Sequence, residues 1–172
     1  MESPASKPVT HRRLILIRHA KAVEEDVGGD HARALSERGR HDAAALGEWM
    51  AAHQLVPELA LCSTANRTRE TLAALGRNIP TILSDRLYLA STNEMLAQVQ
   101  ATDDTISTLL LVGHNPGAHG LAAALVNEYA HDEDETTLLM KFPTAACAVM
   151  QFASASWKDV LPETATLETL RC

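Results

Sequence analysis

Arginine and histidine side chains follow short apolar runs at three points of this chain. They are Arg18 and His19 after residues 14–17, Arg67 after residues 59–63, and His114 after residues 106–112. An arginine fork binds two phosphoryl oxygens at once, and a neutral imidazole is nucleophilic near neutral pH. We therefore expect His19 to attack phosphorus while Arg18 binds the phosphoryl oxygens. Arg67 and His114 would complete the same pocket.

Each of these residues alone also has a structural interpretation. An Arg-His dipeptide arises by chance, Arg67 could pair with Glu70 on its own helix, and His114 could simply begin a helix. The hypothesis gains weight because three separate runs end in groups that suit a phosphate. The chain has no G-x-x-x-x-G-K-[ST], dinucleotide-binding, G-x-S-x-G or H-E-x-x-H motif, so we expect neither a cofactor nor a metal.

The apolar runs are predicted to be strands of a mostly parallel sheet, since they lack polar alternation. The carboxyl ends of such strands share one edge, where α/β proteins bind ligands. Two C-terminal strands, near residues 145–152 and 166–169, have no crossover helix between them, so we expect them to be antiparallel at the sheet edge. Residues 23–34 and the acidic run 131–135 are expected to be loops. The predicted fold class is α/β.

Length and composition bound the class of protein. The 172 residues suit a single domain over residues 13–172, after a disordered leader over residues 1–12. A net charge of −7 argues against nucleic acid or an anionic membrane as partner, and no segment is apolar enough to span a membrane. Three cysteines without metal-ligand spacing favour reduced thiols in a cytoplasmic protein, and Cys172 is assigned no role.

Several segments resemble one known family. Residues 14–22 resemble the Arg-His-Gly/Ala signature of the histidine phosphatase superfamily, which has a phosphoglycerate-mutase-like fold. Ser63-x-x-x-Arg67-Thr68-x-x-Thr71 is similar to its second-arginine motif. Residues 111–116 look like its second-histidine motif, in the form typical of small SixA-like phosphohistidine phosphatases. Residues 33–39 and 141–144 also look SixA-like, so the resemblance covers about residues 14–170 in matching order.

This resemblance implies a three-layer α/β/α sandwich, with His19 as the phosphorylated nucleophile. It implies a protein phosphohistidine phosphatase of SixA type in signal transduction, whose partner is a histidine phosphotransfer domain or a histidine kinase. The short chain leaves no room for a large helical cap. Two alternatives use the same site: a small-molecule phosphomonoesterase or pyrophosphatase, and a catalytically degenerate phosphate-binding protein.

The proton donor for the leaving group stays open at this point. Many members of the superfamily carry an acid for this step, and Glu94 is a candidate by position, although Ser91-x-x-Glu94 equally resembles a helix capping box. A weak or absent acid suits phosphohistidine, because the protonated ring leaves as neutral imidazole. Lys21 is either a cation at the pocket rim or a solvated residue. The upstream loop offers four further carboxyl groups that spacing does not distinguish, Glu24, Glu25, Asp26 and Asp30.

Overall fold

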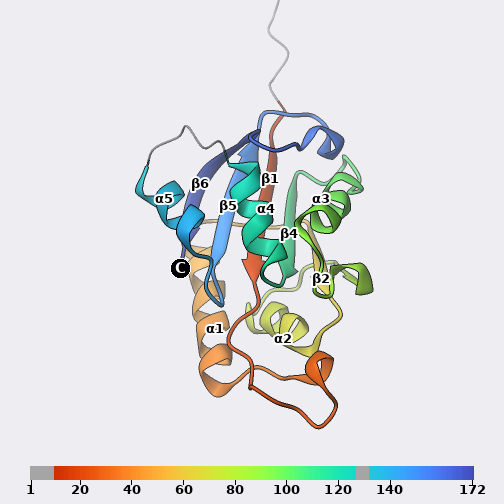
Figure 1. Cartoon of the computed structure of the whole chain (residues 1–172). Coiled ribbons are helices and arrows are strands. Elements are labelled where there is room, and N and C mark those ends of the chain that lie inside the picture. Colours follow the sequence, from red (N-terminus) through yellow and green to blue (C-terminus); the bar gives the residue numbers. More distant parts are fainter. Residues whose placement is uncertain (1–9, 127–131) are drawn as a thin grey trace, which may run out of the picture.

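Figure 1 shows the computed structural model of the chain, which describes residues 10–126 and 132–172. Six strands form one sheet, and α-helices and short 3₁₀ helices connect them. In chain order the elements are β1 (Arg12–Arg18), η1 (Asp30–Ala32), α1 (Glu37–Ala52), β2 (Leu59–Ser63), α2 (Asn66–Ala74), β3 (Thr81–Ser84), η2 (Asp85–Leu87), α3 (Thr92–Gln100), β4 (Thr108–Gly113), α4 (Gly117–Leu125), α5 (Glu133–Met140), β5 (Cys147–Phe152), η3 (Trp157–Asp159) and β6 (Ala165–Arg171).

The strand order of the sheet is β3-β2-β4-β1-β5-β6. The first four strands of this order are parallel, whereas β5 is antiparallel to both β1 and β6. Helices α1 and α2 cover one face of the sheet, and α3 and α4 cover the other (Figure 1). The predicted α/β class is therefore confirmed, with its three layers, its mostly parallel sheet and its antiparallel edge.

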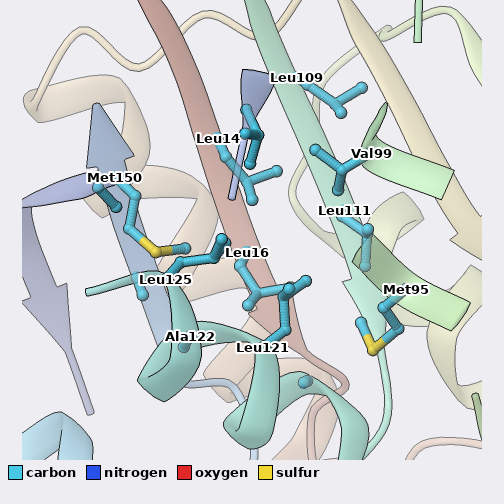
Figure 2. Packing of buried hydrophobic residues seen from close by; sticks show 14 of the residues in the cluster. Leu14, Leu16, Met95, Val99, Leu109, Leu111, Leu121, Ala122, Leu125 and Met150 are labelled. Atoms are coloured by element: carbon cyan, nitrogen blue, oxygen red, sulfur yellow. The ribbon is translucent and has the colours of Figure 1, made fainter. Parts of the chain in front are cut away.

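Strand β1 is buried on both faces, which explains its unbroken apolar run. Leu14 and Leu16 face α3 and α4 together with Leu109 and Leu111 of β4, as Figure 2 shows. The alternate residues of β1 pack on the opposite side, against α1. Because every side chain in residues 14–17 is excluded from solvent, polar groups can appear only where the strand ends.

The ends of β1 and β4 lie level with each other. Arg18 pairs with Gly113 in the parallel register, so the residues that follow them emerge side by side. The amino end of α1 closes the segment after β1, since Ser36 donates through its backbone N–H to the Lys21 carbonyl at 2.9 Å. A Cβ at Gly39 would stand 1.9 Å from the same carbonyl oxygen, so this close approach requires glycine.

The start of β1 differs from the sequence expectation. Strand β1 begins at Arg12, inside the predicted leader, and the Arg12 guanidinium is buried and donates to the carbonyls of Asp104 and Ala155. Residues 1–9 of that leader lie outside the described residues. No helix in the described ranges is long and apolar enough to cross a membrane.

The prediction that the acidic run 131–135 forms a loop is wrong for residues 133–135. These residues form the first turn of α5. Asp132 caps this helix by accepting a hydrogen bond from the Glu135 N–H at 2.8 Å. Acidic side chains favour a helix amino end because of the helix dipole, so the same composition suits a solvated loop and a first helical turn. His131 lies outside the described residues.

Candidate active site

The four predicted site residues lie together at the carboxyl edge of the parallel strands. Arg18 is the last residue of β1 and His19 follows it, Arg67 lies in the first turn of α2, and His114 directly follows β4. The ring centroids of His19 and His114 are 5.3 Å apart. Three strand–helix junctions therefore deliver two arginines and two histidines to one place, as the spacing predicts.

The ring of His19 is held in one orientation. Its Nδ1 lies 2.7 Å from the Ala20 carbonyl oxygen, which can only accept, so Nδ1 carries the hydrogen and Nε2 keeps its lone pair. The Ala20 N–H in turn donates to Thr71 Oγ1 at 3.0 Å, which links this segment to α2. Burial, together with the charges of Arg67 and Arg18, lowers the pKa of His19 to about 4, so the ring is neutral at pH 7.

Arg18 is anchored by the segment that precedes β5. Its Nη1 donates to the Phe142 carbonyl at 3.1 Å, and Asn115 donates to the same oxygen at 2.8 Å. The segment 141–144 thus anchors Arg18, which is one of the residues predicted to bind the phosphoryl oxygens. This contact gives that SixA-like segment a structural role. Burial lowers the pKa of Arg18.

His114 is almost completely buried, with 2% of its surface exposed. Its Nε2 lies 2.8 Å from Ser63 Oγ, at the end of β2, and this hydroxyl also accepts the Ala65 N–H at 3.3 Å. Burial lowers the pKa of His114 to about 3, and the charges of Arg67 and His19 act in the same direction. His114 is therefore a neutral hydrogen-bonding group, and its Nδ1 has no hydrogen-bond partner among the described residues.

Arg67 does not make the ion pair on its own helix that the sequence left open. Its Nη1 donates to the Asp30 carbonyl at 2.7 Å, and its Nη2 donates to Asp30 Oδ2 at 3.1 Å. Glu70 instead accepts from the Leu35 N–H at 2.6 Å and pairs with Arg40 at 3.6 Å. The Arg67 side chain is 3% exposed, so its charge is held inside the site.

Besides Nε of Arg12 at the far end of β1, three buried side-chain nitrogen atoms have no hydrogen-bond partner within the described part of the chain. They are Nε of Arg18, Nε of Arg67 and Nδ1 of His114. Unpaired buried donors are costly and uncommon in native proteins. An anion with several acceptor oxygens would satisfy all three, so the arrangement suits a tetrahedral oxyanion beside His19.

The structure also separates the candidate acids. Glu94 completes a capping box at α3, accepting from the N–H and the hydroxyl of Ser91, each at 2.8 Å. These bonds lower the pKa of Glu94, which favours its ionised form.

Lys21 is exposed. No group of three or more His, Cys, Asp or Glu side chains in the described ranges could hold a metal ion.

Asp30 and Tyr88 are functional candidates that the sequence reasoning did not single out. Asp30 contacts Arg67, and Tyr88 donates to Asp30 Oδ2 at 2.6 Å. The Tyr88 ring also packs edge-on against His114, with centroids 5.7 Å apart. Asp30 was one of four loop carboxyl groups that spacing does not distinguish, and Tyr88 left no signal in the sequence.

Comparison with known proteins places the chain in a family. The profile of the Histidine phosphatase superfamily (branch 1) matches residues 14–95. A structure described as "Putative Phosphohistidine Phosphatase SixA from Nakamurella multipartitia" has a TM-score of 0.86 and 33% identity, covering 96% of this chain and 98% of that one. The chain belongs to the histidine phosphatase superfamily. An uncharacterized protein of Mycobacterium tuberculosis is 37% identical over 152 residues, which cover 88% of this chain and 96% of the relative.

Within the superfamily, the protein is SixA-like and has the phosphoglycerate-mutase-like fold, as the motifs predicted. Membership supports phosphatase activity. The same fold also occurs in small-molecule enzymes. A mycobacterial glucosyl-3-phosphoglycerate phosphatase aligns with a TM-score of 0.59 and 18% identity, covering 92% of this chain and 98% of that one. The family therefore supports a phosphatase, and the choice of substrate requires an argument from this site.

Proposed function

We propose that this protein is a phosphohistidine phosphatase of SixA type that works through a phosphoenzyme on His19. The observation that carries the proposal is the set of three unpartnered donors beside His19, whose ring is neutral and fixed through Nδ1. Phosphoryl transfer needs a nucleophile and cationic donors around the phosphoryl oxygens, and the site supplies both.

In the first step, Nε2 of His19 attacks phosphorus while the bond between phosphorus and the leaving group breaks. Arg18, Arg67 and His114 donate to the phosphoryl oxygens, where negative charge is concentrated. The Ser63 hydroxyl can donate to Nε2 of His114, and in that tautomer the hydrogen of the neutral ring lies on Nδ1, which would donate to the oxyanion. In the second step, water attacks phosphorus, the electron pair of the P–N bond returns to Nε2, and inorganic phosphate leaves.

The leaving group distinguishes phosphohistidine from an ester. An alkoxide needs a proton from an acid as it departs, whereas a protonated phosphohistidine leaves as a neutral ring. Hydrogen bonds from Tyr88 and Arg33 hold the pKa of Asp30 well below its usual range, and Glu94 is engaged in its capping box. Both carboxyl groups are thus poor acids, which favours a protein-borne phosphohistidine over a sugar phosphate.

The test is phosphoryl transfer from a labelled phosphohistidine donor, quenched in alkali, where phosphohistidine survives. We expect label on the wild-type protein and none on His19→Ala. The matched control is His41→Ala, which removes an exposed histidine of α1 and should keep the label. Stoichiometric binding without turnover would contradict catalysis.

A substrate panel tests the choice of leaving group. Phosphoramidate or phosphohistidine donors should turn over faster than aryl phosphates, and aryl phosphates faster than sugar phosphates, because the need for an acid rises in that order. Faster turnover of sugar phosphates than of any phosphohistidine donor would replace the proposal by a small-molecule phosphatase. Phosphotransfer domains and histidine kinases are the proposed partners, and they supply the donor for this panel.

A further inference from the structure

One residue of the loop after β1 holds both terminal nitrogens of Arg67. The Asp30 carbonyl accepts from Nη1 at 2.7 Å and its Oδ2 accepts from Nη2 at 3.1 Å. Asp30 itself is tied in place, since Oδ1 accepts from Arg33 at 2.8 Å and Oδ2 from Tyr88 at 2.6 Å. The guanidinium edge that carries Nη1 and Nη2 is therefore held by a residue 37 positions away in the sequence.

A guanidinium has five N–H donors in one plane. Asp30 takes the edge that contains Nη1 and Nη2, whereas Nε is buried and has no partner among the described residues. From this division we infer that Asp30 is a positioning residue, which orients Arg67 so that its Nε edge faces the bound oxyanion. The identity of that oxyanion as a phosphoryl group rests on the proposed function.

A second role for the same carboxylate predicts the opposite effect. If Asp30 were only a counter-ion that competes with the phosphoryl group for Arg67, its removal would tighten oxyanion binding. Two contacts argue for positioning. The backbone carbonyl of Asp30 is neutral and also accepts from Arg67, and the carboxylate is held at both oxygens, by Tyr88 at Oδ2 and by Arg33 at Oδ1. The two roles thus differ in the sign of a measurable change.

Geometry and charge can be separated with two substitutions. Asp30→Ala removes the charge and every side-chain hydrogen bond, whereas Asp30→Asn removes the charge but keeps one acceptor oxygen for Arg67 and Tyr88. The probe is tungstate, a tetrahedral oxyanion, with binding measured by calorimetry on the full chain. The positioning role predicts a dissociation constant about tenfold higher for Asp30→Ala, because one charge-assisted contact is misaligned. Asp30→Asn should show a smaller increase.

Asp26→Ala is the matched control, because it removes a carboxylate from the same loop. Asp26 accepts from the Gly28 N–H at 2.7 Å, and no hydrogen bond of the described residues joins it to Arg67. This variant should bind tungstate as the wild type does. The melting temperature without ligand should be unchanged in Asp26→Ala and lower in Asp30→Ala, which loses the ion pair to the buried Arg67, so dissociation constants are compared well below both midpoints.

The outcomes separate this inference from the proposed function. Equal or tighter tungstate binding by Asp30→Ala overturns positioning, and tighter binding identifies Asp30 as a competing counter-ion. A fall in melting temperature without any change in the dissociation constant also overturns it, since the role would then be structural. A wild type that binds no tungstate overturns the oxyanion pocket and this inference together. Weakened binding in Asp30→Ala with no phosphohistidine turnover by the wild type supports positioning and contradicts only the substrate.

Discussion

His19 and Arg67 are each held through one edge of the side chain, and the other edge is the one proposed to meet the phosphoryl group. His19 uses Nδ1 for the Ala20 carbonyl, which leaves Nε2 as a nucleophile, and Arg67 uses its outer edge for Asp30, which leaves Nε for an anion. Each side chain is thus fixed by the half that does not react. Preorganised donors of this kind need little rearrangement when charge develops on a ligand.

Arg67→Lys keeps the positive charge but removes the planar fork. A lysine ammonium cannot contact Asp30 and the oxyanion through two separate edges. We expect kcat/KM for phosphohistidine substrates to fall on the order of 100-fold, with an unchanged circular dichroism spectrum. The matched control is Arg69→Lys, an exposed position of the same helix, which should keep wild-type activity. Wild-type rates in Arg67→Lys would show that Arg67 does not bind the phosphoryl group.

The two site histidines should titrate well below the usual histidine range. The pKa of His19 is lowered to about 4 and that of His114 to about 3, from 6.5. Between about pH 4 and 6.5 the unfolded chain therefore binds more protons than the folded one, so these residues make stability rise with pH across that window. Ring-proton NMR titration of the ligand-free protein, with His19→Ala and His114→Ala for assignment, measures the midpoints. A midpoint near 6.5 for either ring would contradict the burial argument.

At the scale of elements, the site depends on strands that end level and helices that begin at their ends. The β1–β4 register sets Arg18 opposite Gly113, and α2 begins one turn beyond β2. Glycine at position 39 lets α1 approach the segment after His19. The apolar runs predicted this arrangement because buried strands have a distinct pattern, whereas the α5 helix shared its acidic composition with a loop.

Glu94 caps the start of α3, and we expect it to take no part in the chemistry, which Glu94→Gln tests. An amide keeps one acceptor oxygen for Ser91, so we expect kcat/KM within about twofold of the wild type, as for other surface substitutions. Ser91→Ala removes the cap itself and should lower the free energy of unfolding by about 1 kcal/mol without changing kcat/KM. Steady-state kinetics and urea unfolding measure both. A tenfold loss of kcat/KM in Glu94→Gln would make this carboxyl group the proton donor.

At the scale of the molecule, the sheet is apolar on both faces, and a layer of helices covers each face (Figure 1). Two of the three cysteines lie in this interior, and Cys172 is exposed. Burial raises the pKa of Cys62 and of Cys147 to about 12. The buried thiols are therefore protonated and shielded from reagents.

Thiol labelling should follow this division. With a colorimetric disulfide reagent, we expect one thiol to react quickly in the native protein and three after unfolding, because the thiolate is the reactive form. Cys172→Ser should abolish the fast reaction and leave two thiols that react only on unfolding. A second fast thiol in the native wild type would mean that the sheet core opens readily.

The sequence by itself determined which side chains end the buried strands, and hence the fold class and the four candidate residues. It could do so because strand burial and strand–helix junctions are local patterns. Only the tertiary structure decided how those residues are held. It pairs Arg67 with Asp30 instead of the nearby Glu70, and it assigns Glu94 to a capping box. Such pairings depend on the path of loops between distant segments, and residue spacing carries no record of that path.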